Sequence, residues 1–477
     1  MKRFFALFLA LVMVLSIFGC AKKPSDKDKD KDKADAGEVK SEPAVWSDTT
    51  VVSEEMYTYF FNAYYRYYLE TYAASLNSLG LDPAKALSAQ KYSDEYTWHQ
   101  YLTLQVYTQL REMIALADAA KADGIKLSKE DKEAINVQVA EFDKLAKEAN
   151  VSVDDYIVKA YGKGVTKNVI KQASELRTLA NKYYKKLVGS YEFTEEDCNA
   201  YYEKNRDSFL HFDYIKMTVS KEDAKILGTC RDEKSFVDAI RQIITDNNFI
   251  GDYDRFKDTI EKQVAKKYYY RASYDPVSSI GKWLMEEGRK GYDIHTKTES
   301  SGDITVSMVL PTNDPGAINS VLYRDELPLK NVMYMVFDDS EGTEGKVKAE
   351  SIYKNWQENP TADRFEELCN KYDGGKGEDV SRNQFNADID AWVFAEDRKA
   401  GDCAIIEVTG GAYLLYMLED GEAAWLSEVK DALAENKYDE DLKGIIDKYP
   451  TEYNSDFIYK LTEVKVSSGS SDTTAAK

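Results

Sequence analysis

The sequence is poor in the residues that most often carry metal or redox chemistry. It has three histidines and five cysteines in 477 residues, and the cysteines beyond Cys20 stand far apart at Cys198, Cys230, Cys369 and Cys403. This spacing contains no CxxC pair and no zinc-binding pattern, so we expect neither a metal site nor a cofactor. Scattered thiols of this kind are expected to be mostly free or buried, and a single disulfide of unidentified pairing is the alternative.

Motifs of several common enzyme classes are also missing. The chain contains no HExxH and no GxSxG sequence, and Gly162-Lys163-Gly164 is too short for a phosphate-binding loop. Proline is scarce at nine residues, whereas tyrosine is abundant at 35. This composition indicates few rigid turns and many rings that combine an apolar body with a polar tip.

Positive charge is in deficit. The chain has 63 Lys and Arg residues against 84 Asp and Glu residues, a formal net charge of −21. Phosphates and anionic lipid headgroups repel such a chain, so we expect no nucleic-acid partner. Attachment to a membrane therefore requires a lipid anchor. Hydrophobic residues still make up 43% of the sequence, which is enough for the cores of two or three domains.

The first 20 residues predict export and lipid attachment. A basic start is followed by an apolar run from Ala6 to Phe18, which is too short to cross a bilayer. Cys20 directly follows this run and a glycine, an arrangement that resembles a bacterial lipobox. The resemblance implies that the signal peptide, residues 1–19, is removed and that Cys20 receives lipid. Ordinary secretion with a chance cysteine is the alternative.

Residues 20–47 are predicted to be a lipidated, disordered tether. They contain very few apolar side chains, and Asp26 to Lys33 alternates acid and base. Such a segment cannot bury enough apolar area to offset the chain entropy of ordering it. We therefore expect the folded part to lie outside the cytoplasm, anchored to the bacterial cell membrane through Cys20.

Residues 48–209 are predicted to form a helical domain. Ser53 is a predicted N-cap, and Ser128, Ser152 and Thr194, each followed three residues later by Asp, resemble capping boxes. The first helix carries an aromatic stripe at three-to-four spacing: Tyr57, Phe61, Tyr64, Tyr68 and Tyr72. Such a stripe is either packed in a helical core or offered to extended client chains, and we take these five rings as candidate client-binding residues.

The C-terminal half contains an internal repeat. Residues 283–293 match residues 392–402 at an offset of 109, with Trp, Glu, Arg, Lys and Asp recurring. Around each copy the pattern predicts a strand, a helix, a loop, a Trp-bearing helix and a second strand. The expected fold class is α+β, a helical chaperone-like domain followed by two βα modules. The predicted segments of this half are module 1 at 210–325, module 2 at 326–420, C-terminal helices at 421–466 and a disordered tail at 467–477.

Several of these segments resemble one protein family. Residues 122–130 and 194–205 resemble helix-end signatures of the SurA/PrsA-type extracytoplasmic foldases, and 398–402 with 409–415 is similar to the end of a parvulin (rotamase) domain. The resemblance implies a SurA-like helical domain followed by two parvulin-like modules. It also implies a foldase that binds unfolded or partly folded exported polypeptides, with modules related to peptidyl-prolyl cis-trans isomerases.

The catalytic pattern of that family is missing from both modules. Parvulins use one His in the first strand and one in the last. The corresponding positions here are Tyr214 and Thr305 in module 1 and Met333 and Tyr413 in module 2, and no His lies within one residue of them. We therefore expect degenerate modules with weak or absent isomerase activity.

Two alternatives to a chaperone remain open. One is an active isomerase in which hydroxyl groups, such as those of Tyr214 and Tyr413, replace the His pair. The other is a surface-anchored scaffold lipoprotein that recognises one folded partner. The oligomeric state is not indicated by the sequence.

Overall fold

The computed structural model describes residues 42–247, 268–312, 320–339 and 344–464, apart from residues 373, 383, 396 and 409. The predicted signal peptide, the lipid site Cys20, most of the tether and the tail lie outside the described residues. The chain divides into two units, one that ends at Glu192 and resumes at Ala434, and one from Phe193 to Leu433. No helix among the described residues has both the length and the apolar content needed to span a membrane.

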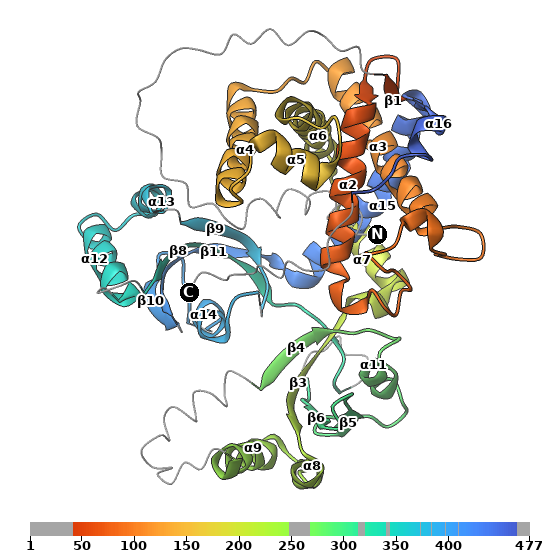
Figure 1. Cartoon of the computed structure of the whole chain (residues 1–477). Helices are drawn as coiled ribbons and strands as arrows, with labels where there is room; N and C mark the ends of the chain where they lie inside the picture. The colour runs from red at the N-terminus through yellow and green to blue at the C-terminus, as the bar shows by residue number, and fades with distance from the viewer. Residues whose placement is uncertain are drawn as a thin grey trace. The chain divides into compact units, whose positions relative to one another are not determined.

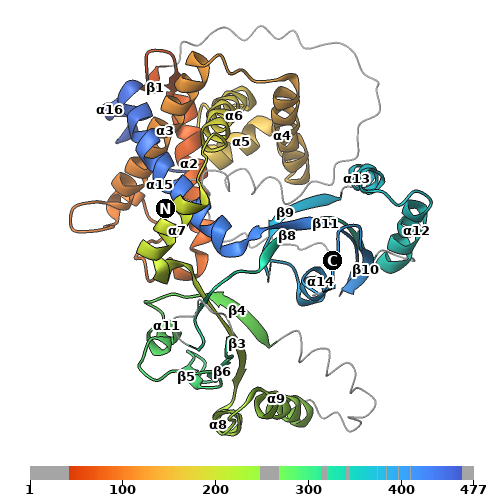
Figure 2. The same ribbon diagram turned by 180° about the vertical axis from the view of Figure 1, so that it is seen from behind.

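The fold is α+β, as predicted. It comprises an N-terminal helical region, two antiparallel sheets with their own helices and a long C-terminal helix (Figure 1). Figure 2 shows the same elements from behind. Helix α15 begins in the second unit and ends in the first.

The first unit contains segments from both ends of the chain. Strand β1 pairs with β2 on one side and with β12 on the other, so that Val45 lies opposite both Val52 and Tyr453. Its helices and strands are β1 Pro43–Trp46, β2 Val51–Ser53, α2 Glu54–Thr71, η1 Ala73–Ser75, η2 Leu87–Ala89, α3 Trp98–Ala122, α4 Lys129–Glu148, α5 Val153–Tyr161, α6 Lys167–Val188, most of α15 Ala424–Lys448, β12 Glu452–Tyr453 and α16 Ser455–Ile458.

Local capping explains where these helices begin. The Ser53 hydroxyl accepts from the amide of Met56 at 3.2 Å, and Ser128 forms a reciprocal capping box with Asp131. At Ser152 the box is incomplete, because the Asp155 carboxylate accepts from the Ser152 hydroxyl instead of its amide. The predicted N-caps are thus confirmed, with one difference in detail.

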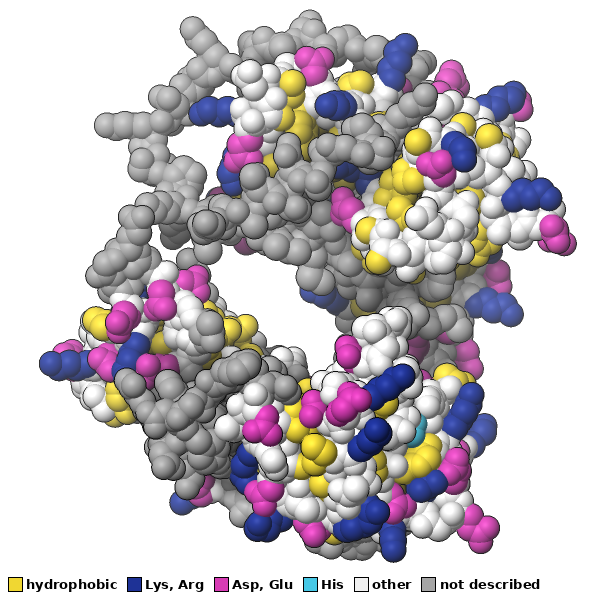
Figure 3. Space-filling view, turned by 60° about the horizontal axis from the view of Figure 1, so that its bottom comes forward, with side chains coloured by type: hydrophobic (Ala, Val, Ile, Leu, Met, Phe, Trp, Pro, Cys, Tyr) yellow, Lys and Arg dark blue, Asp and Glu magenta, His cyan; other side chains and the backbone are white. Residues whose placement is uncertain are grey.

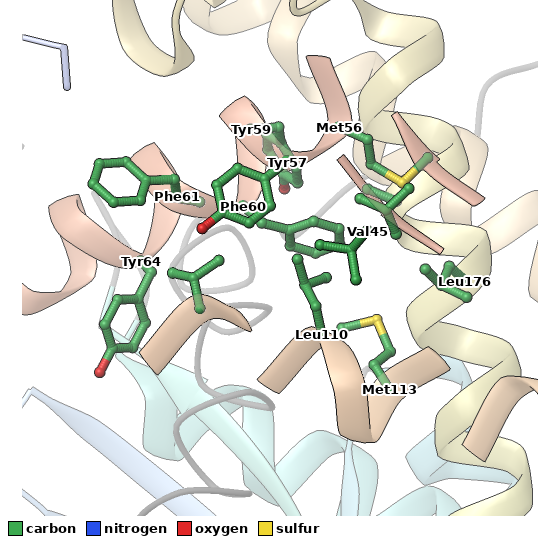
Figure 4. Packing of buried hydrophobic residues seen from close by; sticks show 14 of the residues in the cluster. Val45, Met56, Tyr57, Tyr59, Phe60, Phe61, Tyr64, Leu110, Met113 and Leu176 are labelled. Atoms are coloured by element: carbon green, nitrogen blue, oxygen red, sulfur yellow. The ribbon is translucent and has the colours of Figure 1, made fainter. Parts of the chain in front are cut away.

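Helix α2 lies at the centre of the first unit's core. Every residue from Met56 to Tyr65 is buried, on all sides of the helix. Figure 4 shows part of this packing, in which rings of α2 lie near Leu110 and Met113 of α3. Rings on every face of a helix can be buried only when it is covered on every side, and here α3, α5, α6 and β1 contact it.

The second unit contains two sheets of the same plan. Strand order is β4-β3-β6-β5 in the first, with β7 added beside β3, and β9-β8-β11-β10 in the second. The elements are α7 Glu195–Lys204, η3 Arg206–Phe209, β3 Leu210–Val219, α8 Lys221–Gly228, α9 Glu233–Asn247, β4 Tyr269–Ser273, α11 Ser279–Leu284, β5 Ile294–Thr298, β6 Ile304–Val309, β7 Tyr323–Arg324, β8 Pro328–Asp338, α12 Gly345–Gln357, α13 Ala362–Lys371, β9 Gly375–Val380, α14 Ala387–Val393, β10 Cys403–Val408 and β11 Gly411–Ala423.

Each sheet is covered on both faces. Helices α8 and α9 cover one face of the first sheet, where Ile215 and Met308 are buried, and α12 and α13 cover the same face of the second. The short helices α11 and α14 lie on the opposite faces, over Phe212 and Val332 respectively. The even-numbered residues of β3 and β8 therefore share a face with the Trp-bearing helices.

The second unit includes a helix that precedes its first sheet. It begins at Phe193, because α7 packs on the start of α15, where Cys198 and Tyr202 are buried with Trp425 and Val429, and β3 of the first sheet follows at Leu210. The four cysteines in the described residues are free, with three buried and Cys403 partly exposed.

Candidate functional site

The repeated sequence forms the same turn in both modules. In module 1 the guanidinium of Arg289 lies 4.3 Å from the ring centre of Trp283 and donates through Nε to the Trp283 carbonyl at 3.1 Å. Its Nη1 lies 3.4 Å from Asp293. In module 2 Arg398 makes the same three contacts, at 4.2 Å to the Trp392 ring, 2.9 Å to the Trp392 carbonyl and 3.0 Å to Asp402.

The backbone of this Trp–Arg–Asp turn leads into β5 or β10 and is hydrogen-bonded to the following strand, β6 or β11. The carbonyl of Asp293 accepts from Val309 at 3.1 Å, and that of Asp402 accepts from Met417 at 2.8 Å. The residue before each Asp has a positive φ, 73° at Tyr292 and 91° at Gly401. The repeated residues therefore set the geometry of the sheet, and their side chains are engaged in holding it.

The strand positions singled out by the resemblance do not all share a face. Tyr214 pairs with Val309 in module 1. The equivalent of Val309 in module 2 is Met417, which pairs with Val332. Met333 is thus one residue out of register and is buried on the opposite face, beneath α12 and α13. Met333 therefore does not lie on the face that carries Tyr214 in module 1, and Val332 is the match to Tyr214.

In module 1 the face that carries Tyr214 is occupied by its own side chains. The Tyr214 ring stacks between those of Phe212 and Tyr270, with ring centres 5.1 and 5.4 Å away. The Thr305 hydroxyl donates to Glu299 at 2.8 Å and lies 2.7 Å from that of Thr218. The Tyr214 ring and the Thr305 hydroxyl are therefore both engaged in local contacts.

In module 2 the corresponding face is aromatic. Tyr413 is partly exposed and lies beside Tyr334, with ring centres 6.4 Å apart. Tyr334 also packs edge-on against Phe385 at 5.7 Å. The structure thus brings Tyr413 into a ring cluster, whereas Thr305 at the same place in module 1 is hydrogen-bonded to Glu299.

The three histidines occupy unrelated positions. His99 is buried in the first unit with Nε2 2.6 Å from the carbonyl of Leu461, and His295 lies 3.1 Å from the Ser279 hydroxyl. His211 is buried and pairs with Glu428 at 3.2 Å. Burial lowers the pKa of His211, but the hydrogen bond and charge of Glu428, with the charge of Asp325, outweigh it and raise that pKa.

The five candidate client-binding rings separate into two groups. Tyr57 and Phe61 are fully buried, and they support the interpretation of the stripe as part of a core. A client cannot reach them while the unit is folded, so we do not retain them as binding residues. Tyr64 and Tyr68, also buried, and Tyr72, which is 38% exposed, lie towards the end of α2.

These last rings belong to a larger group that we term the aromatic cluster. Tyr68 contacts Tyr72 at 4.6 Å and Trp98 at 5.5 Å between ring centres. Tyr92, which is 43% exposed, stacks flat on Tyr101 at 3.8 Å and meets Trp98 edge-on at 4.8 Å. The cluster comprises Tyr64, Tyr68, Tyr72, Tyr92, Trp98 and Tyr101.

The loop between α2 and α3 places Tyr92 in this cluster. Gln90 ties the loop together by accepting from the amide of Asp82 at 2.7 Å and donating to the carbonyls of Asp82 and Lys85. Leu81 and Leu87 anchor it in the core. The exposed ring of Tyr92 is therefore held by an ordered loop over the fully buried Trp98.

Burial favours the neutral form of three phenol groups of the cluster, those of Tyr64, Tyr68 and Tyr101. Burial, with the nearby hydroxyls of Tyr72 and Tyr92, raises the pKa of Tyr68 to about 12. Burial also raises the pKa values of Tyr64 and Tyr101. The cluster thus offers apolar ring faces and uncharged hydroxyl donors, which suits contact with peptide segments of varied sequence.

The sequence signalled only part of this cluster. Tyr92, Trp98 and Tyr101 were outside the predicted stripe, although the dense aromatic run from Tyr92 to Trp98 was a usable signal. What could not be seen was that the loop folds back on α2. Within the described ranges there is no group of His, Cys, Asp and Glu side chains arranged to hold a metal ion.

On the face shown in Figure 3, basic and acidic side chains are interspersed among apolar ones. No protein-family model matches this chain, and no curated protein is found that is similar to it.

Proposed function

We propose that this chain is a lipid-anchored extracytoplasmic chaperone that binds unfolded exported polypeptides, with two parvulin-like modules of weak or absent isomerase activity. The observation that carries the proposal is the aromatic cluster. Its rings Tyr72 and Tyr92 are exposed on a base of buried rings. Rigid rings provide contact area at low entropic cost, and their hydroxyls bond to any peptide backbone, so recognition does not depend on one sequence.

The residues at the first-strand and last-strand positions of the two modules support the same proposal. Neither Tyr214 and Thr305 in module 1 nor Val332 and Tyr413 in module 2 provides the His pair of the resembled family. Isomerisation requires donors directed at the amide during a rotation that faces a barrier of ~18–20 kcal/mol. Modules without such donors retain a use as binding or spacing elements.

A second candidate function rests on Tyr413. Its ring is partly exposed on an aromatic face of module 2, and the Tyr413 hydroxyl is the donor that this face offers at the last-strand position. An isomerase in which this hydroxyl replaces a histidine is the runner-up, and a refolding assay separates it from the chaperone.

The test of the chaperone is suppression of aggregation. The full mature chain, added at a stoichiometric amount to a thermally unfolding reporter enzyme, should reduce light scattering. The double variant Tyr72→Ser/Tyr92→Ser should need about threefold more protein for the same effect, since it removes two exposed ring surfaces. Val137→Ser, which alters an exposed apolar residue on α4 that is 60% accessible, is the matched control and should behave as the native chain.

A native chain that leaves aggregation unchanged at stoichiometric amounts contradicts the proposal. A pull-down that returns one folded, basic protein and no unfolded chains would favour the scaffold alternative. Equal loss of activity in Val137→Ser and in the double variant would show that the aromatic cluster is not the binding surface.

A further inference from the structure

The edge strand β10 of module 2 has the features of a site for strand addition. Among the described residues it pairs with β11 alone, from Cys403 opposite Tyr416 to Val408 opposite Gly411. Met417 donates to the carbonyl of Asp402, which fixes the phase of the ladder. Because hydrogen-bonded pairs alternate in an antiparallel ladder, the main-chain groups of residues 404, 406 and 408 face β11.

The main-chain groups of Cys403, Ile405 and Glu407 therefore point away from the sheet. No other main-chain or side-chain group of the described residues bonds to them. All six residues of β10 are partly or fully exposed. Three N–H and three C=O groups in a row form a template for another extended chain.

Two other edges of these sheets, β9 and β5, carry features that oppose such pairing, whereas the edge strand β4 pairs with β3 without a shift and holds the charged Arg271. Strand β9 has a register shift against β8, glycines at 375 and 377, and Asp379 with φ 51°. Strand β5 contains Lys297 and is mostly exposed and polar. Bulges and lysines are the means by which edge strands avoid pairing. Strand β10, with the sequence Cys-Ala-Ile-Ile-Glu-Val, contains no Lys, Pro or Gly and pairs without a shift.

Each side of β10 carries an isoleucine, and Glu407, on the side of Ile405, pairs with Lys346 of α12 at 2.7 Å. Ile405 borders the cluster that includes Phe365 and Tyr416, on the side of α12 and α13. Ile406 borders the cluster that includes Val393 and Leu415, on the side of α14. Alternate side chains of an added strand would meet these two borders in turn.

We propose that β10 binds an extended segment of an unfolded polypeptide as an additional antiparallel or parallel strand. The proposal rests on the proposed chaperone function and names the way in which module 2 contributes to it. Main-chain hydrogen bonds supply the affinity and tolerate varied side chains, as strand addition does in other recognition domains.

A second copy of this chain fits the edge less well than such a segment. Two copies each carry a formal charge of −21 and repel one another. A six-residue edge also buries much less than the roughly 1,200–2,000 Å² typical of a stable protein–protein interface. A flexible segment of another chain needs neither a large interface nor a fixed partner surface.

The test uses fluorescently labelled, reduced and carboxymethylated α-lactalbumin as a permanently unfolded probe of the full mature chain. Ile405→Pro removes one outward N–H and blocks the close approach of an added strand. It spares the hydrogen bonds between β10 and β11, because the main-chain N–H of Ile405 points away from β11. Binding of the probe should weaken about fivefold or more, the loss expected for one or two hydrogen bonds. Ile405→Ala, which keeps the N–H, should bind within about twofold of the native chain.

Thr296→Pro is the matched control in module 1. Thr296 has the equivalent outward position on β5, one residue after the pair formed by His295 and Ser307. This variant should bind the probe as the native chain does. Circular dichroism and thermal unfolding identify any variant that fails to fold.

Hydrogen exchange at residue level supplies a test that needs no variant. The amides of Cys403, Ile405 and Glu407 should exchange quickly in the free chain and slow at least about tenfold with the probe, as a new hydrogen bond requires. The proposal is overturned if these amides stay fast with bound probe, or if they slow on raising protein concentration alone, which would indicate self-pairing. Absence of any probe binding would instead overturn the proposed chaperone function.

Discussion

The two modules of the second unit share a backbone plan and differ on the sheet face beneath the Trp-bearing helix. Each has the Trp–Arg–Asp turn, with Arg289 and Arg398 in matching contacts. At the last-strand position one module has Thr305, bonded to Glu299, and the other has Tyr413 in a ring cluster. The comparison teaches that both copies of the repeat keep the Trp–Arg–Asp turn and the backbone plan, whereas the side chains on this sheet face differ between the modules.

The largest effect on the free energy of unfolding is expected from substituting the arginine of the Trp–Arg–Asp turn, which both modules contain. Arg398 is 17% exposed and its bonds to Trp392 and Asp402 are shorter than those of Arg289, which is 25% exposed. Arg398→Ala removes the charged donor to the Trp392 carbonyl and to the Asp402 carboxylate, which keeps only the amide of Lys399, and should lower the free energy of unfolding by about 2–3 kcal/mol. Arg289→Ala should cost about 1–2 kcal/mol.

Chemical denaturation followed by tryptophan fluorescence measures both variants. Arg364→Ala, in which the lost partners are the exposed Glu367 of α13 and the exposed side chain of Asn355 of α12, is a control that should change stability by about 0.5–1 kcal/mol. Equal costs for Arg398→Ala and Arg364→Ala would show that the turn is not a structural element.

The repeat shows how much of this architecture the sequence could predict. The offset of 109 residues located both modules and the α+β class, because Trp, Arg and Asp recur in a fixed order. The edge strands β5 and β10 were missed. Strand β5 reads Ile-His-Thr-Lys-Thr, and this short run has no alternation of apolar and polar residues.

The one-residue shift at Met333 has a similar origin. Val332 and Met333 are both buried, each on a different face of the sheet. A strand covered on both faces reads as a continuous apolar run, so its sequence does not show which residues share a side. The aromatic cluster was missed in part for a different reason, since the stripe on α2 was visible but the loop that brings Tyr92 onto it is held by contacts distant in sequence.

The start of the first strand offers a smaller and pH-dependent contrast. His211 of β3 pairs with Glu428, whereas the equivalent residue of β8 is the buried Leu329. The pKa of His211 in the folded chain is raised above its usual 6.5, so its pairing stabilises the fold fully below pH 6.5. This stability is lost as the pH rises through the folded pKa.

Unfolding free energies at pH 6 and pH 8 measure this effect. Stability of the native chain should fall between these values, and Glu428→Gln should reduce the fall by removing the charge that raises the pKa. The groups that face His211 are Ser273, Glu428, Asp325 and Arg271. Histidine is the side chain among these residues whose usual pKa lies between pH 6 and pH 8. An unchanged slope in Glu428→Gln would assign the pH dependence to other groups.

The smallest expected effect concerns the face that most resembles an enzyme site. If the modules bind without catalysing, catalytic amounts of the full chain should leave the slow, proline-limited refolding of a reporter protein unchanged. Tyr413→Phe removes the one hydroxyl that module 2 offers at the last-strand position and should give the same rate. Acceleration by the native chain that Tyr413→Phe abolishes would instead make module 2 an isomerase. The difference between Thr305 and Tyr413 would then be a difference between a silent module and an active one.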